Sequence, residues 1–566
     1  MKPMFALLAA SLAATASAGA AQPARQPNFL VIVADDIGWS DLGAFGGEIA
    51  TPNLDALAYG GVRFTGFHTA PTCSPTRAML MSGVDNHEAG LGSMAELLVP
   101  AQRGQPGYEG YLNDRVASIA ELLHQGGYRT VMAGKWHLGL SPERGPAARG
   151  FEHSFALLEG LANHFGADQS AAWAAIGAAP TYRDDGAIAR YPTGRFSADV
   201  YADRLIDYLE RGRDDPRPFF AYLAFTTPHW PMQAPPEDIA RYKGRYDTGY
   251  EALRAERLAR AKRLGLVAAD VVPHPLEEAR PWATLTTGER AAEARTMEVY
   301  AAMVDRTDRD VGRVIEALRR TGRYDDTVIV FLGDNGPEGG TIDHPQQADT
   351  QAKLATLGID NSLANIGAAT SYVGYGSGWA QANSAPSWLF KAYTTEGGTR
   401  TAAFVAGAGV AGHRIAGADL SVIDVAPTLL SLAGLRQPTS FAGHPILPHE
   451  GHSLAPLLAG RTDVVRGPQE VVGSELFYRR AVRQGDWKAV YLPRNAAIRG
   501  RTSVGDGRWR LFDVARDPGE TRDLAAAEPR RLRTLTVAWD VYAKNHQVVV
   551  PPRDEPIPVP VAGDER

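Results

Sequence analysis

Four short apolar runs, each followed at once by polar residues, constrain the fold of this 566-residue chain most strongly. The runs are NFLVIVA at 28–34, RTVMA at 129–133, FFAYLAF at 219–225 and TVIVFL at 327–332. Short continuous apolar runs of this kind are typical of strands buried on both faces of a parallel sheet. Helical patterns lie between them, for example at 116–123 and 298–318. The alternation predicts an α/β fold in which a large mixed, mostly parallel sheet is sandwiched by helices.

The residues that follow the four runs are candidates for one functional site. In open sheets of this kind, ligands bind outside the carboxyl ends of the strands. The polar residues found there, in chain order, are Asp35, Asp36, Lys135, His137, His229, Asp334 and Asn335. Any one of these clusters alone is better explained as a turn, a surface lysine or a buried structural histidine. Their joint occurrence at strand ends is what indicates a site.

Four of these residues indicate a metal. Asp35, Asp36, Asp334 and Asn335 offer only oxygen ligands. Three carboxylates crowded into one site repel one another unless a cation neutralises them. Hard oxygen donors suit Ca²⁺ or Mg²⁺ rather than Zn²⁺.

Cys73 is the only cysteine and opens the sequence Cys73-Ser74-Pro75-Thr76-Arg77. Ser74 can cap a helix and Pro75 fits a first helical turn, so Cys73 is expected just outside a helix N-terminus. Free backbone N–H groups, the helix dipole and the Arg77 guanidinium would make that position an anion site. The alternative is that Cys73 is a small buried hydrophobic residue, the usual place of a lone free cysteine.

The N-terminus predicts export. Residues 1–20 combine an early lysine, an apolar stretch and small residues suited to cleavage, as in a secretory signal peptide. We therefore expect a periplasmic or secreted bacterial protein without stable membrane insertion after cleavage. In such a compartment a single cysteine cannot form an internal disulfide. A formal charge of −6, without a basic cluster, excludes nucleic acid as an expected partner.

The chain divides into a main domain at 27–450 and a C-terminal α+β domain at 451–550. The latter is predicted from short antiparallel strands at 479–483, 487–492 and 509–513 and from one packed helix at 529–545. A proline-rich tail occupies 551–566. Two inserts interrupt the main domain: 235–287, with a charged helix at 251–264 expected to be solvated, and 339–388, expected to line a substrate entrance.

Together these residues resemble the type I sulfatases of the alkaline phosphatase superfamily, and most closely the bacterial arylsulfatases. Cys73-Ser74-Pro75-Thr76-Arg77 matches the signature Cys-x-Pro-x-Arg. The remaining motifs follow in the family order: Ala34-Asp35-Asp36-Ile37-Gly38, Gly134-Lys135-Trp136-His137-Leu138-Gly139, Pro228-His229, Gly333-Asp334-Asn335-Gly336 and Lys391. The resemblance implies an alkaline phosphatase-like fold and the hydrolysis of sulfate monoesters, with a small-molecule sulfate ester as substrate.

The resemblance also implies a cofactor and a set of roles. A maturation enzyme would convert Cys73 to formylglycine (3-oxoalanine), whose hydrated aldehyde is the nucleophile and carries the sulfate as an enzyme-bound intermediate. The family's metal ligands correspond here to Asp35, Asp36, Asp334, Asn335 and the modified Cys73, which would bind one Ca²⁺ in preference to Mg²⁺. Arg77 would hold the formylglycine hydroxyl, and Lys135 and Lys391 the sulfate oxygens. His229, with Lys391, would protonate the leaving alcohol, and His137 would take a proton so that sulfate is expelled.

Two other functions fit part of this pattern. A phosphonate monoester or phosphodiester hydrolase of the same superfamily would use the same formylglycine, although Asn335 in place of a histidine favours the sulfatase. A non-catalytic anion-binding protein, with Cys73 unmodified, would have no need of proton donors. The aromatic-rich segment 372–379, which includes Trp379, favours an aryl substrate over a polyanionic sugar; alternatively it packs its own aromatic rings on the surface.

Overall fold

The computed structural model describes residues 26–340, 348–494 and 504–550. The expected signal peptide at 1–20 and the proline-rich tail at 551–566 lie outside the described residues, as does part of the second insert. Within the described ranges, every helix is too short or too polar to cross a membrane.

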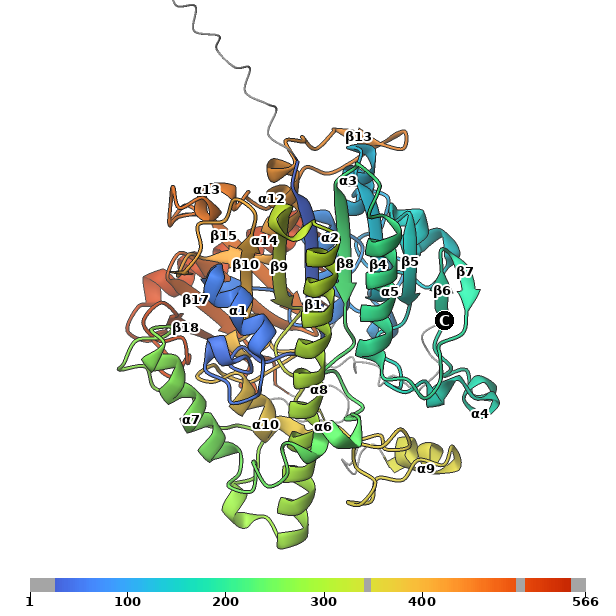
Figure 1. Ribbon diagram of the computed structural model, residues 1–566. Helices are drawn as coiled ribbons and strands as arrows, with labels where there is room; N and C mark the ends of the chain where they lie inside the picture. The colour runs from blue at the N-terminus through green and yellow to red at the C-terminus, as the bar shows by residue number, and fades with distance from the viewer. Residues whose placement is uncertain (1–25, 341–347, 495–503, 551–566) are drawn as a thin grey trace, which may run out of the picture.

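A ten-stranded sheet runs through the described chain in the order β11-β2-β10-β9-β1-β8-β4-β5-β6-β7 (Figure 1). Its strands are β1 (Asn28–Ala34), β2 (Val62–Phe64), β4 (Arg129–Lys135), β5 (His153–Leu157), β6 (Tyr182–Asp184), β7 (Ala187–Ala189), β8 (Phe219–Ala224), β9 (Thr327–Gly333), β10 (Ala403–Gly407) and β11 (Arg414–Ala416). The central run from β9 to β5 is parallel throughout, whereas β10, β6 and β7 pair antiparallel. The prediction of a large mixed, mostly parallel sheet is confirmed. The four predicted strands are the neighbours β9, β1, β8 and β4.

Helices cover both faces of the sheet, as predicted, because alternate residues of each buried strand point to opposite sides. Leu30 and Ile32 of β1 pack in the layer that contains α1 (Pro52–Gly60), α5 (Ser197–Arg211) and α8 (Thr287–Arg320). Val31 and Val33 pack in the layer that contains α2 (Cys73–Ser82), α3 (Ile119–Gln125) and α12 (Val425–Leu432). The first layer faces the viewer in Figure 1.

Two helices differ in length from the prediction. The run at 116–123 becomes helical only at Ile119, because Ser118 caps that helix with Glu121. The run at 298–318 is the larger, C-terminal part of α8, which begins eleven residues earlier at a capping box formed by Thr286 and Glu289. The early turns of α8 carry too few apolar residues to give a helical period.

The first insert contains α6 (Pro236–Ala240) and α7 (Tyr250–Arg263). The expectation that its charged helix is solvated is wrong, because one side of α7 is buried and its Arg257 pairs with Asp41 and Glu48. The second insert contains α9 (Ala348–Thr356) and α10 (Gly376–Asn383), and α10 packs on α7. Trp379 therefore lies in the core, edge-on to Tyr250 and Trp282, rather than in an aromatic surface loop.

A separate four-stranded antiparallel sheet lies near the C-terminus, as predicted. It consists of β15 (Val471–Leu476), β16 (Arg479–Gln484), β17 (Trp487–Tyr491) and β18 (Trp509–Asp513). The predicted helix is α14 (Pro529–Asn545), which packs on one face of this sheet through Leu535, Trp539 and Tyr542. Val490 and Phe512 on the other face pack with Trp388 and Phe390, which lie between α10 and the short helix at Glu396–Thr399.

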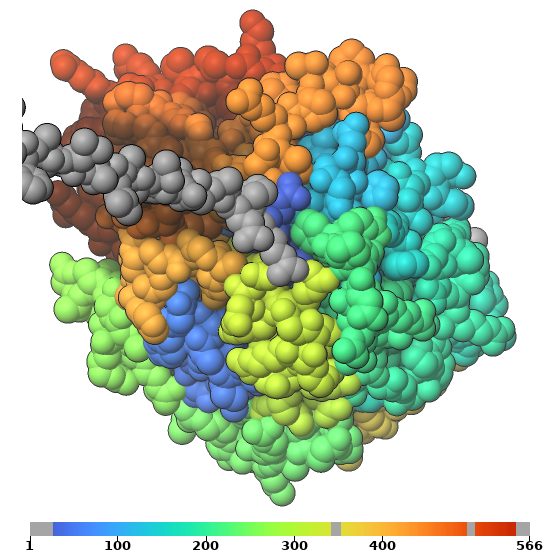
Figure 2. All heavy atoms as spheres, turned by 45° about the horizontal axis from the view of Figure 1, so that its top comes forward, coloured from blue at the N-terminus to red at the C-terminus, as the bar shows by residue number. Residues whose placement is uncertain are grey.

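The remaining elements are short. They are β3 (Phe67–His68), β12 (Leu420–Ser421), β13 (Ser440–Phe441), β14 (His444–Pro445), α4 (Ala171–Ala175), α11 (Glu396–Thr399) and α13 (Ala455–Leu458). Figure 2 shows the segment after α12, in orange, beside the light blue segment that precedes α3. There the Leu447 N–H donates to the Arg115 carbonyl (2.8 Å), which joins the two segments.

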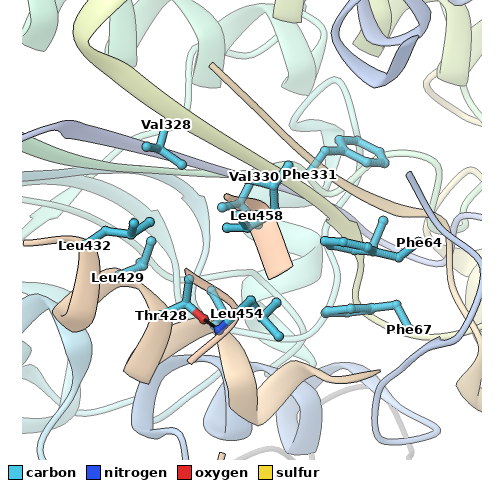
Figure 3. A pocket seen from close by; sticks show the side chains of 13 residues that line it. Phe64, Phe67, Val328, Val330, Phe331, Thr428, Leu429, Leu432, Leu454 and Leu458 are labelled. Atoms are coloured by element: carbon cyan, nitrogen blue, oxygen red, sulfur yellow. Dashed lines mark hydrogen bonds between the residues drawn. The ribbon is translucent and has the colours of Figure 1, made fainter. Parts of the chain in front are cut away.

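A small apolar cavity lies between the sheet and α12 (Figure 3). Phe64, Val330, Leu429 and Leu458 are among its lining residues, and its volume is about 10 Å³. The hydroxyl of Thr428 is engaged, since it donates to the Asp424 carbonyl (2.6 Å) and accepts from the Leu454 N–H (2.7 Å). The space is barely large enough for one water and its lining is apolar, so it lacks the polar partners that an ordered water needs. It is a packing gap rather than a ligand site.

Candidate active site

The polar residues predicted at the strand ends meet at one place. Ligand atoms of Asp35, Asp36, Cys73 and His229 all lie within 4.8 Å of one another. The Asp36 N–H donates to Asp334 Oδ1 (3.2 Å), and Asn335 Nδ2 donates to Asp36 Oδ1 (2.7 Å). These residues follow β1, β8 and β9 or begin α2. The carboxyl edge of the parallel sheet is therefore the site that the sequence pattern indicated.

Backbone geometry directs the two aspartates that follow β1. The sheet pairing continues one residue past the strands, because the Asp35 N–H donates to the Thr227 carbonyl (3.0 Å) and the Asp334 N–H to the Ala34 carbonyl (3.1 Å). Asp36 then adopts a left-handed conformation (φ 66°), which aspartate tolerates better than most residues. This abrupt turn places two consecutive carboxylates in the same site.

Cys73 is the first residue of α2, and Thr72 is the N-cap, without a side-chain capping bond. The prediction that Cys73 lies outside the helix with Ser74 as cap is wrong. Pro75 is nonetheless tolerated, because the first helical N–H groups have no intrahelical acceptor. Cys73 is buried, and burial raises the pKa of its thiol to about 12 although Lys135 and Lys391 oppose this. The thiol is therefore not a thiolate nucleophile at neutral pH.

Three buried cations pair with the three carboxylates. Lys135 Nζ lies 2.7 Å from Asp35 Oδ2, and Lys391 Nζ lies 2.7 Å from Asp36 Oδ1. Arg77 donates to Asp334 Oδ2 through both Nε (3.0 Å) and Nη2 (2.7 Å). Burial alone would lower the pKa of both lysines, but their carboxylate partners outweigh it and raise each pKa, so both ammonium groups stay charged.

Arg77 makes a further contact with the backbone of the site. Its third donor, Nη1, bonds to the Lys135 carbonyl (2.9 Å), and its side chain is fully buried. The guanidinium thus connects α2 to the ends of β4 and β9, which fixes the position of Cys73 one helical turn away.

The donor set fits a divalent cation. Asp35 Oδ1 and Asn335 Oδ1 are buried and have no hydrogen-bond partner among the described residues. Burial and the nearby Asp334 raise the pKa of Asp35 to about 7, and burial also raises the pKa of Asp36. Burial would raise the pKa of Asp334 too, but Arg77, Lys135 and Lys391 hold it below its usual value. A cation would satisfy both free oxygens and favour the ionised carboxylates.

His229 is oriented by its backbone surroundings. Its Nδ1–H donates to the Trp230 carbonyl, which leaves Nε2 facing Asp36 Oδ2 at 3.5 Å. His164 Nε2 in turn donates to the His229 carbonyl (2.8 Å), and its Nδ1 accepts from Ser197 Oγ (2.7 Å). Burial lowers the pKa of His164 to about 4, so it is a neutral hydrogen-bonding residue. Sequence reasoning missed His164, although it follows β5 at the same sheet edge.

His137 lies against an acid that sequence reasoning also missed. Its Nε2 is 3.4 Å from Glu96 Oε1, and its backbone is left-handed (φ 56°). Burial lowers the pKa of His137, while Glu96 opposes the change. Glu96 sits in a short 3-10 turn (Ala95–Leu97) that carries no motif. A second missed acid, Glu338, lies 3.7 Å from Lys391 Nζ; its place four residues after Asp334 was a usable signal.

Aromatic side chains adjoin His229. The half-buried Trp230 ring stacks on the imidazole, with centroids 5.8 Å apart and planes 18° apart. Tyr372 meets Trp230 edge-on at 5.3 Å, and Trp173 lies 5.9 Å from Tyr372. Of the aromatic segment predicted near the pocket, Tyr372 therefore contacts this cluster, whereas Trp379 does not.

Comparisons with known proteins agree with this geometry. A family model described as Sulfatase matches residues 27–435. The arylsulfatase of Klebsiella aerogenes is 40% identical over 444 residues, covering 77% of this chain and 94% of that protein. An uncharacterised sulfatase of Schizosaccharomyces pombe is 43% identical over 542 residues, covering 94% and 96%. The crystal structure of Ps i-CgsB in complex with k-i-k-neocarrahexaose has the same fold, with a TM-score of 0.65, 22% identity and coverage of 93% and 94%.

Proposed function

The chain belongs to the sulfatase family, whose members hydrolyse sulfuric esters, and from this premise we propose that it cleaves aryl sulfates to a phenol and inorganic sulfate. The observation that carries the proposal is the convergence of Cys73, a carboxylate cluster and paired lysines with two histidines at one sheet edge. We further propose export to the periplasm or medium through the N-terminal signal, and a division into domains near residue 451.

The nucleophile is proposed to be formylglycine, made from Cys73 by a maturation enzyme. The protonated, buried thiol supports this, because an unmodified Cys73 would be a poor nucleophile near neutral pH. A hydrated aldehyde at this position would supply a hydroxyl nucleophile. Arg77 stands one helical turn away, fixed by Asp334, and provides a permanent positive charge beside that hydroxyl.

The metal is proposed to be one Ca²⁺, with Mg²⁺ as the less suitable ion. Asp35, Asp36, Asp334, Asn335 and the modified residue 73 would hold it. The free oxygens of Asp35 and Asn335 support this assignment, and the neutral Asn335 oxygen suits the larger, more flexibly coordinated ion. When bound, the cation supplies positive charge that neutralises the carboxylates and acidifies the nucleophile.

The two lysines are proposed to bind the sulfate oxygens. Lys135 and Lys391 are charged, and they pair with Asp35 and Asp36 respectively. Fixed ammonium groups in a buried site stabilise the negative charge that develops on the sulfuryl oxygens. His229 Nε2 would donate a proton to the departing phenol oxygen, because its Nδ1–H is committed to the Trp230 carbonyl. His137 would act as the base that releases sulfate.

The aryl preference is supported by the cluster of Trp230, Tyr372 and Trp173. Trp230 stacks beside the proposed proton donor and is only half-buried, so it offers an aromatic face to the leaving group. Such ring contacts contribute roughly 0.5–1.5 kcal/mol each. Glu338, close to Lys391, adds negative charge that disfavours a polyanionic sugar.

One preparation of the full chain, coexpressed with a formylglycine-generating enzyme, tests the proposal. The mass of the peptide containing residue 73 gives the modified fraction, and a panel of aryl sulfate, aryl phosphate and phosphonate monoester gives the specificity. We expect aryl sulfate to be the best substrate and Cys73→Ala to abolish its turnover. Full activity in Cys73→Ala, or an unmodified thiol in active protein, would refute the mechanism; preference for the phosphonate would favour the alternative hydrolase.

A further inference from the structure

His137 is held in a single orientation by its neighbours. Its Nε2 faces Glu96 Oε1 at 3.4 Å, whereas its Nδ1 is buried and has no hydrogen-bond partner in the described ranges. Gly160 packs directly against the ring, since a Cβ at this position would be 2.7 Å from Cε1 of the imidazole. Turning the ring would disturb this packing, and Nδ1 is the ring nitrogen that does not face Glu96.

Glu96 owes its position to the C-terminal sheet. Met94 and Leu97, on either side of it, pack against Leu476, Phe477 and Tyr478. Phe477 and Tyr478 form the two-residue turn between β15 and β16, and both are left-handed (φ 53° and 69°). Such a turn ordinarily prefers asparagine and glycine, so aromatic residues persist there because their packing outweighs the backbone strain.

The hairpin formed by β15 and β16 also holds the segment that carries Lys391. Arg479 Nη1 donates to the Ala392 carbonyl (2.8 Å), and its guanidinium lies 3.8 Å from the centre of the Tyr393 ring. One hairpin of the C-terminal sheet thus fixes both the acid beside His137 and the backbone next to a proposed sulfate-binding lysine. The hairpin therefore positions residues of the proposed site as well as packing against the rest of the chain.

We infer that Glu96 is a positioning residue for His137: its carboxylate keeps the neutral imidazole protonated at Nε2 and so reserves Nδ1 for accepting a proton. This rests on the proposed function, in which His137 is the base. In a neutral imidazole one ring nitrogen carries the proton, and only the other nitrogen can accept one. When Nδ1 accepts a proton from the hydroxyl of modified residue 73, Nε2 keeps its own proton, and the ionised Glu96 offsets the new positive charge.

The first test needs no activity. The unmodified chain, with Cys73 intact and histidines labelled with ¹⁵N, reports each tautomer through its ring ¹⁵N shifts, and His137→Gln assigns the His137 signals. We expect the Nε2–H tautomer in the wild type and in Glu96→Gln, whose amide oxygen can still accept, but not in Glu96→Ala. The exposed Glu143 supplies the matched control, Glu143→Gln, which should match the wild type. An Nδ1–H tautomer in the wild type, or an unchanged signal in Glu96→Ala, would overturn the inference.

The second test separates the effect of the Glu96 charge on catalysis from its effect on the His137 tautomer. With activity expressed per formylglycine, Glu96→Gln should lower kcat for an aryl sulfate by about 10- to 100-fold, leave KM within about twofold, and keep its tautomer. Glu96→Asp, which restores the carboxylate, should recover part of the loss, and equal melting temperatures would exclude misfolding. Wild-type kcat in Glu96→Gln would contradict the charge role. If the wild type cleaves no sulfate ester, the proposed function fails while the tautomer result still stands.

Discussion

Removing the cation at different pH values tests the electrostatic account of the site. Asp35 and Asp36 are buried beside Asp334, and two ligand oxygens have no hydrogen-bond partner among the described residues. The pKa of Asp35, about 7 without a cation, lies above the ordinary value of 3.8. Because a cation binds the ionised carboxylate, it must displace a proton from Asp35 whenever the pH is below about 7.

The direction and the size of the pH effect on stability and on Ca²⁺ affinity follow from this pKa. A carboxyl group whose pKa is raised by folding stabilises the cation-free protein when protonated, below about pH 4. That contribution is lost as the pH rises through about 7. The cation-free protein should therefore lose stability between pH 4 and 7, while Ca²⁺ affinity rises. About half of the Asp35 carboxyl groups are protonated at pH 7 and nearly all of them at pH 5, so the displaced proton should lower the Ca²⁺ affinity roughly 50-fold, or about 2.3 kcal/mol, between these two pH values.

Thermal unfolding of the full chain, with excess Ca²⁺ or with a chelator, measures the effect at pH 5, 7 and 8. We expect Ca²⁺ to raise Tm much more at pH 8 than at pH 5, and Asp35→Asn to remove most of that difference. Asp308→Asn is the matched control: burial also raises the pKa of Asp308, to about 6, but its carboxylate bonds to Asn53 and Leu54. An equal Ca²⁺ shift at pH 5 and pH 8 would refute the reasoning.

Three substitutions test the rest of the site. Arg77→Met leaves Asp334 buried without its bidentate partner and should destabilise the protein by about 3–5 kcal/mol in urea unfolding; a loss below about 1 kcal/mol would mean that the pair is not buried in solution. Trp230→Ala should lower kcat/KM for an aryl sulfate by about 2- to 12-fold and leave a short alkyl sulfate unaffected, whereas an equal loss on both would remove its leaving-group role. Trp379→Ala should cost about 3–5 kcal/mol of stability without changing KM, and a raised KM with normal stability would return Trp379 to the pocket.

The sequence predicted the bounds of an element correctly where the pattern that specifies it lies within the element itself. The strand at Asn28–Ala34 and the helix at Pro529–Asn545 have their predicted bounds, because a continuous apolar run and a regular apolar face each specify an element without help from distant residues. The strand-end clusters were informative for a related reason. The carboxyl ends of parallel strands lie at the same edge of the sheet, so the residues that follow neighbouring strands are brought close together.

The errors concern side chains whose surroundings come from far along the chain. Trp379 lies among glycines and a serine, which indicated a loop, but α7, more than a hundred residues earlier, supplies a helix that buries it. Arg257 belonged to a charged helix expected in solvent, yet Asp41 and Glu48 pair with it in the interior. Glu96 depends on a turn at Phe477 and Tyr478. No local pattern specifies such contacts.

The charge balance of the site bears on the proposed role of the two lysines, which pair with carboxylates and, in the proposed function, would also bind the sulfate anion. With all groups ionised, Asp35, Asp36 and Asp334 carry −3, and Lys135, Lys391 and Arg77 carry +3, so the six sum to zero. A neutral cluster of paired charges has little attraction for a sulfate ester. A bound divalent cation would raise the sum to +2 and take over the carboxylate oxygens, which would free the ammonium groups for the substrate. On this account the cation is required for substrate binding itself, and the nearby Glu338 limits the charge gained to what a single sulfate group needs.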